Sequence, residues 1–173
     1  GVFCSGADLK YIRGGGDSRD FGYLQPEGNA PAGGFGESFK QILEYLHSTI
    51  SEIKRAPKPF IAAVDGMAAA GGFGIAMACD LVYASPTASL RTPFLDLGLI
   101  QEAGSTLTAP ARMGYPRAFE LICLGEPFGA ERALQAGLIN AIVPADKLEE
   151  TALKAARRLA ASAVRDASRQ RSP

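Results

Sequence analysis

The sequence predicts an α/β fold in a single domain. Short apolar runs with the length and composition of buried strands alternate with stretches of helical periodicity, which is typical of α/β architecture. The 173 residues suit one domain with a sizeable core, and neither an internal repeat nor a clear domain boundary interrupts them.

The stretch 60–80 contains the central strand and helix. Phe60–Val64 is an apolar run with β-branched residues that ends at a turn, and it predicts a buried strand. A short buried helix is expected to begin at Gly71 and Gly72. The first N–H groups of such a helix lack partners and lie at its positive end, so they suit an anion or a polarised oxygen. The alternative is that the small residues only permit tight packing of helix against strand.

The segments that precede residue 60 predict a strand end, a loop and a helix. Residues 1–10 resemble the end of a strand followed by a turn, and the glycine-rich stretch 14–36 predicts a mobile loop. Residues 37–55 have apolar side chains at three- and four-residue steps, which predicts a helix that Pro57 ends. His47, the only histidine, lies beside that apolar stripe, and we expect a partly exposed structural residue there.

The segments after the centre continue the alternation, with a polar tail beyond Ala163 that is expected to fray. The expected elements are strands over 81–84 and 88–91, an apolar connection over 93–100, helices from about 101 to 113, 116–124 and 129–136, a strand over 138–143 and an amphipathic helix over 147–161.

Composition and motif checks argue against several function classes. The 18 basic and 18 acidic residues give no overall charge that would favour nucleic acid or a membrane surface. The three cysteines are far apart, so we expect reduced, packed thiols in an intracellular protein and no disulfide frame or metal site. A dinucleotide-binding fingerprint would need a glycine at Met77, and a serine-hydrolase motif is missing.

Four motifs together resemble the enoyl-CoA hydratase/isomerase (crotonase) superfamily. They are FCSGADLK at 3–10, PKPFIAAVDGMAAAGG at 57–72, ACDLVYAS at 78–85 and FGAERALQAGLINAIVP at 128–144. The resemblance implies the ClpP/crotonase ββα superhelix, with a core over 1–145 and the start of a C-terminal helical region over 146–173. Against the family's pattern the chain looks like a fragment that lacks N- and C-terminal parts.

The resemblance also implies how substrate is held. Backbone N–H groups of Ser5 and Gly71 would form an oxyanion hole for the thioester oxygen of an acyl-CoA, stabilising an enolate. The implied substrate-binding residues are Ser5, Gly6, Ala7, Asp8, Leu9, Gly71 and Gly72. No metal is implied, and no cofactor beyond the coenzyme A of the substrate. The implied assembly is a homotrimer or hexamer, with neither nucleic acid nor membrane as a partner.

One carboxylate stands out as a candidate base. The two glutamates of the family's hydratases correspond here to Gly74 and Phe94, so ordinary hydratase chemistry is not expected. The segment PFLDLGLIQEAGST at 93–106 is similar to peroxisomal-type delta-3,delta-2-enoyl-CoA isomerases, in which the glutamate matching Glu102 is the catalytic base. Asp96 is a lesser candidate. The alternative for Glu102 is that it caps the helix that follows.

The resemblance therefore implies an isomerase that converts 3-enoyl-CoA to 2-enoyl-CoA in fatty-acid β-oxidation or related acyl-CoA metabolism. Two other functions stay open: an enoyl-CoA hydratase and a non-catalytic acyl-CoA-binding scaffold, because fold does not fix function. The implied compartment is the peroxisome, although the chain ends Arg-Ser-Pro rather than on a peroxisomal signal, with mitochondrion or cytoplasm as alternatives.

Overall fold

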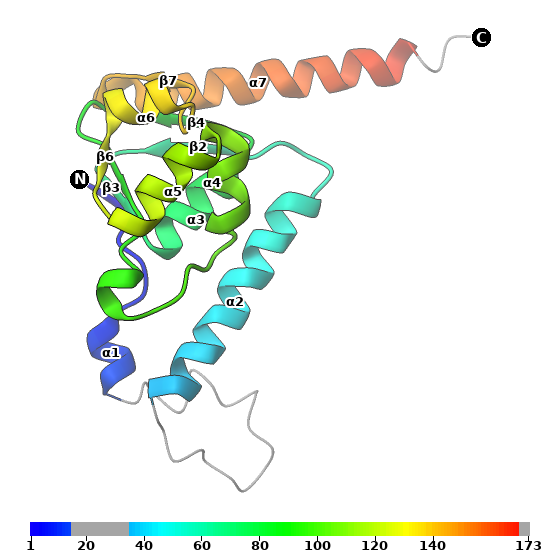
Figure 1. Cartoon of the computed structure of the whole chain (residues 1–173). Coiled ribbons are helices and arrows are strands. Elements are labelled where there is room, and N and C mark those ends of the chain that lie inside the picture. Colours follow the sequence, from blue (N-terminus) through cyan, green and yellow to red (C-terminus); the bar gives the residue numbers. More distant parts are fainter. Residues whose placement is uncertain (15–34, 170–173) are drawn as a thin grey trace, which may run out of the picture.

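The computed structural model describes residues 1–14 and 35–169 and confirms the α/β class (Figure 1). The strands are β1 (Val2–Cys4), β2 (Ile61–Val64), β3 (Met67–Ala69), β4 (Leu81–Ala84), β5 (Ser89–Arg91), β6 (Phe128–Gly129) and β7 (Ala141–Ile142). The helices are α1 (Leu9–Arg13), α2 (Phe35–Arg55), α3 (Gly71–Ala78), α4 (Ser105–Met113), α5 (Tyr115–Leu124), α6 (Ala130–Ala136) and α7 (Ala145–Arg169), with a 3₁₀ turn over Leu95–Leu97.

The strands form two sheets that the chain visits in turn. One sheet has the order β1-β3-β5-β6 and the other the order β2-β4-β7. The pairs β1–β3, β3–β5, β2–β4 and β4–β7 are parallel, and only β5–β6 is antiparallel within the part of the chain described. Because β2 and β3 are followed by α3, and β4 and β5 by further helices, the chain repeats a strand–strand–helix unit. This is the expected ββα superhelix.

Helix α3 lies at the centre of the core, as the apolar stretch 60–80 predicts. Its side chains Phe73 and Met77 are fully buried, together with Val64 of β2 and Val82 of β4. Helix α2 packs along α3 through Leu46 and Ile50 and extends beyond it toward α1 (Figure 1). The candidate site therefore lies where α3, α2 and the N-terminal segment meet.

A partly buried arginine ties α4 to this core. The guanidinium of Arg112 donates hydrogen bonds to the carbonyl oxygens of Leu138 (3.3 Å), Met77 (3.3 Å) and Cys79. Burial lowers the pKa of Arg112. Because Met77 and Cys79 lie at the C-terminal end of α3, this contact fixes α4 against α3 and so fixes the connection that precedes α4.

Most predicted elements are present, with differences at the weaker patterns. The strand over 81–84 and the helix over 37–55 are found, the latter beginning two residues earlier. The sequence reading did not include β3, β6 or α1, all five residues or shorter. The expected loop over 14–36 falls largely outside the described residues.

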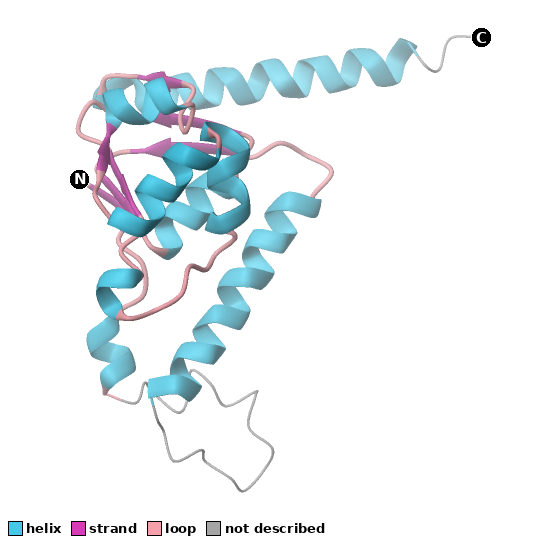
Figure 2. Cartoon of the chain, in the orientation of Figure 1, coloured by secondary structure: helices cyan, strands magenta, loops and turns pink. Residues whose placement is uncertain are grey.

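The C-terminal helix differs from its prediction. Helix α7 continues to Arg169 and projects beyond the sheets (Figure 2), so fraying from Ala163 is wrong over 164–169. The three cysteines are free thiols, as expected, and burial raises the pKa of Cys79. None of the described helices is both long enough and apolar enough to cross a membrane.

Candidate functional site

A cavity of about 250 Å³ lies between the N-terminal segment, helix α2, the start of α3 and the connection from β5 to α4. Its walls are mostly apolar, and Glu102 supplies a carboxyl group to them. The lining residues are Ser5, Ala7, Leu9, Phe39, Ala70, Arg91, Pro93, Phe94, Asp96, Leu97, Leu99 and Glu102. Four elements far apart in the sequence therefore converge on one small space.

The two predicted N–H-bearing segments lie against each other. Gly6 has a φ of 96°, and a Cβ placed there would lie 2.9 Å from Ala70 Cβ and 3.6 Å from the nitrogen of Gly71. Helix α3 begins without any side-chain hydrogen bond at its N-terminus. Its first N–H groups are therefore available beside the Ser5–Gly6 turn. Ser5 itself lines the cavity.

The glycines of α3 also pack closely, so the alternative explanation of this stretch is partly correct. A Cβ at Gly72 would lie 2.7 Å from Cys4 Cβ, and one at Gly71 would lie 3.0 Å from a methyl group of Leu46. Gly72 therefore permits close approach to the end of β1, and neither Gly71 nor Gly72 lines the cavity with its own atoms. Packing and N–H supply are compatible roles for this helix start.

Backbone strain is concentrated at the same place. Among the described residues, only Ala70 (φ 51°) and Ala103 (φ 54°) are non-glycine residues with a positive φ. An L-residue pays for this conformation, and it persists only where surrounding packing enforces it. Ala70 precedes the first turn of α3 and Ala103 follows Glu102, so both strained residues flank the cavity.

Glu102 is placed as an isolated carboxyl group. Its Oε2 atom is buried and has no hydrogen-bond partner among the described residues. Burial raises the pKa of Glu102 from the ordinary value of 4.5 to about 7. A carboxyl group with this pKa can both accept and return a proton near neutral pH.

The capping role considered for Glu102 is wrong. Helix α4 begins at Ser105, its N-cap is Gly104, and the first turn contains no acidic residue. Only the backbone oxygen of Glu102 serves the helix, because it accepts hydrogen bonds from the N–H (3.0 Å) and Oγ (2.7 Å) of Ser105. The side chain is left free to face the cavity.

Some of the other predicted site residues line the cavity, and others make contacts elsewhere. Leu9 lines the cavity with Ser5 and Ala7, whereas the Asp8 carboxylate caps α1 by accepting the N–H groups of Lys10 (2.9 Å) and Tyr11 (3.1 Å). Asp96 lines the cavity but pairs with Arg91 at 2.6 Å, so it is a poorer base than Glu102.

The apolar connection over 93–100 contributes only part of its length to the cavity. Phe94, Leu97 and Leu99 line the cavity, whereas Ile100 is 87% exposed and is not among the lining residues. Sequence reasoning missed Phe39, Ala70 and Arg91 as lining residues. Phe39 belongs to a helix whose apolar stripe was visible, but nothing in that stripe indicates which end faces a cavity.

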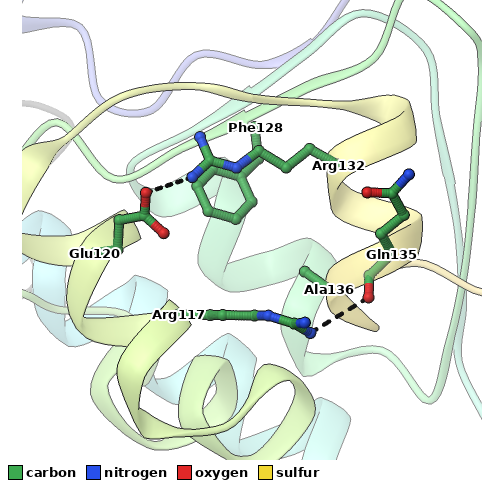
Figure 3. Close-up of a pocket in the computed structure, with 6 residues that line it drawn as sticks. All are labelled: Arg117, Glu120, Phe128, Arg132, Gln135 and Ala136. Carbon is green, nitrogen blue, oxygen red and sulfur yellow. Dashed lines mark hydrogen bonds and ion pairs between the residues drawn. The ribbon is translucent and has the colours of Figure 1, made fainter.

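A second hollow between α5, β6 and α6 is a different kind of surface (Figure 3). Arg132 pairs with Glu120 at 2.5 Å and stacks 3.8 Å from the ring centre of Phe128, while Arg117 donates to the backbone oxygen of Gln135 at 3.4 Å. Each guanidinium has a partner. The described residues also contain no group of three metal-binding side chains.

Comparison with known proteins places the chain in a family. The family model described as enoyl-CoA hydratase/isomerase matches residues 1–171. The chain belongs to the enoyl-CoA hydratase/isomerase family. The predicted superfamily is thereby confirmed, and the family is enzymatic. A crystal structure of enoyl-CoA hydratase from Bacillus anthracis is 34% identical, with a TM-score of 0.76 over 91% of this chain and 54% of that one.

Two relatives within this family differ in their named activities. The glyoxysomal fatty acid beta-oxidation multifunctional protein MFP-a of Cucumis sativus is 37% identical over 87% of this chain and 20% of its own length. The 4-chlorobenzoyl coenzyme A dehalogenase-1 of Arthrobacter sp is 29% identical over 93% of this chain and 53% of its own length. The chain thus spans about half, or less, of the length of these relatives.

The two positions that the resemblance matches to the glutamates of the family's hydratases carry no carboxylate here, and position 74 has no room for a side chain. At Gly74, an added Cβ would lie 2.7 Å from the backbone oxygen of Ala103 and nearer still to its Cβ. Phe94 is 2% exposed and fills its position with a ring. Glu102 is therefore the one carboxyl group that lines this cavity without an ion-pair partner among the described residues.

Proposed function

We propose that this chain carries the active site of an isomerase that converts a 3-enoyl-CoA to the conjugated 2-enoyl-CoA. The observation that carries the proposal is the partly buried carboxyl group of Glu102, whose Oε2 atom has no hydrogen-bond partner among the described residues, in a mostly apolar cavity that Ser5 also lines. A carboxyl group without hydrogen bonds costs stability, and a perturbed pKa in a cavity is typical of a catalytic group.

The reaction needs one base and one charge-stabilising element. The Glu102 carboxylate takes a proton from C2, the electrons of that C–H bond move into the thioester, and a dienolate forms. The N–H groups of Ser5 and Gly71 donate to the dienolate oxygen, where the negative charge develops. Glu102 then returns the proton to C4, which leaves the double bond between C2 and C3. The apolar walls around Phe94 limit access of water to the dienolate.

Hydration is a less suitable function for this cavity. Adding water to a 2-enoyl thioester requires groups that hold and deprotonate the water and protonate carbon. Positions 74 and 94 supply neither group. A non-catalytic scaffold would gain nothing from the isolated carboxyl group at 102, since an apolar residue there would cost less free energy.

We further propose an acyl-CoA substrate, no cofactor other than the coenzyme A it carries, and action as a homotrimer or hexamer in the peroxisome. The family match and the glyoxysomal relative support the substrate class and the compartment.

The test is to offer the whole protein 3-enoyl-CoA and 2-enoyl-CoA separately. We expect conjugation to appear in the ultraviolet spectrum with the first substrate, and no 3-hydroxyacyl-CoA with the second. Hydration of 2-enoyl-CoA without isomerisation of 3-enoyl-CoA would contradict the proposal. Tight binding of both thioesters with no turnover would favour the scaffold.

A further inference from the structure

The turn that carries Glu102 is held by contacts from three directions. From α4, Ser105 donates to the Glu102 backbone oxygen. From α3, Gly74 packs against the methyl group and carbonyl of Ala103. From α2, the third contact is a hydrogen bond in which the N–H of Ala103 donates to Nε2 of His47 at 3.3 Å.

The contact with His47 uses Nε2 as the acceptor. An imidazole nitrogen accepts a hydrogen bond only when it carries no proton, so this contact requires the tautomer with its proton on Nδ1. The ring is largely exposed and does not line the cavity. His47 therefore has no direct route to substrate, and any effect on chemistry acts through the Ala103 backbone.

The backbone at Ala103 adopts a conformation that packing and hydrogen bonds from neighbouring elements must stabilise. Ala103 has a φ of 54° and Gly104 a φ of 70°, so two consecutive residues adopt the left-handed region. Glu102 receives no hydrogen bond at Oε2 that would fix its carboxyl group directly. The position of the carboxyl group therefore depends on the backbone of the turn and on packing against the cavity walls.

We propose that His47 is a positioning residue, whose neutral Nε2 holds the Ala103 N–H and thereby keeps the turn that directs Glu102 into the cavity. The inference rests on the proposed function, because it assigns His47 a role in the work of the Glu102 base. It goes beyond a structural histidine, since it predicts an effect on turnover that exceeds any effect on stability.

The test compares His47→Leu, which cannot accept the N–H, with His47→Gln, whose Oε1 can. We expect His47→Leu to lower kcat about 10- to 100-fold, the range for a displaced catalytic group. KM and acyl-CoA affinity should change by less than about twofold, because the cavity walls are unaltered. His47→Gln should recover most of the lost kcat. Ser48→Leu, on an exposed neighbouring position of α2, is the control for adding leucine.

The same substitutions made in a Glu102→Gln protein separate this inference from the proposed function. In a Glu102→Gln protein, His47→Leu should cause no further loss, because both changes act on one proton transfer. Unchanged turnover in Glu102→Gln alone would overturn the proposed function. A large loss in Glu102→Gln with equal kcat for His47→Leu and wild type would overturn only the role of His47. Equal losses in the leucine and glutamine variants would also overturn it, and His47→Ala repeats the comparison if leucine prevents folding.

Discussion

Glu102→Gln is the substitution that most directly tests the proposed base. The amide has nearly the size of the carboxyl group but cannot accept a proton from carbon at neutral pH. We expect the isomerisation rate to fall by about 10²–10⁴, the usual contribution of a positioned general base. Acyl-CoA affinity should be retained, because Oε2 makes no hydrogen bond among the described residues that the amide would lose.

The same substitution should change how stability depends on pH. Burial raises the pKa of Glu102 from 4.5 to about 7 in the folded protein, so the native state binds the proton more tightly than the unfolded state. The unfolding free energy is therefore undiminished below pH 4.5 and decreases as the pH rises toward 7. The shift would correspond to about 3 kcal/mol for a fully buried group, and solvent screening of this partly exposed side chain reduces it to about 1–2 kcal/mol.

Urea denaturation at about pH 5 and about pH 8 measures this difference. Glutamine does not titrate, so the variant should gain stability relative to wild type between these two values. Glu126→Gln, at an exposed position outside the cavity, is the matched control and should show no such gain. Parallel pH dependence of wild type and Glu102→Gln would refute the burial argument, and an unchanged isomerisation rate would refute the catalytic assignment.

Three further outcomes are expected. Gly71→Pro removes an N–H that the proposed mechanism directs at the developing oxyanion, and it should lower turnover about 10²–10³-fold. Gly71→Ala, which meets Leu46 but keeps the N–H, should lower turnover far less. Gly74→Ala drives a Cβ into Ala103 and should destabilise by about 1–3 kcal/mol in denaturant titrations, while Gly129→Ala, with no atom within 4 Å, should be nearly neutral. The value of kcat/KM should rise about tenfold per pH unit up to about pH 7 and then level off, because the proposed base Glu102 must be deprotonated to act. A flat profile from pH 5 to 8 would contradict the assignment of Glu102 as the base.

The sequence predicted those parts of the fold whose patterns are strong. β2 and β4 were found to within one residue because each is an apolar, β-branched run between turn signals. β3 was missed because Met67–Ala69 contains no β-branched residue, and its strand conformation depends on pairing with β1 and β5. Asp8 was a missed signal for α1, since aspartate is a preferred N-cap.

The site was predictable in its chemistry but less so in its geometry. The glycine-rich helix start predicted the N–H groups at Gly71, the resemblance supplied Glu102 and Ser5, and the structure places Ser5 and Glu102 on one cavity. The strained conformations of Ala70 and Ala103 were not predictable, because alanine gives no sequence signal for a positive φ. They follow from packing against Gly6 and Gly74, which brings together positions about 30 to 60 residues apart.

The contact between Gly74 and Ala103 gives a physical reason why the proposed site has one carboxyl group rather than two. A glutamate at position 74 would need the space that Ala103 occupies, and Ala103 directly follows Glu102 in a turn that also contacts His47. The turn that directs Glu102 into the cavity and a carboxylate on α3 therefore exclude each other in this backbone. Moving one proton between two carbons of the same substrate requires only one base, whereas holding a water and protonating carbon requires more. The packing at position 74 thus supports double-bond isomerisation over hydration.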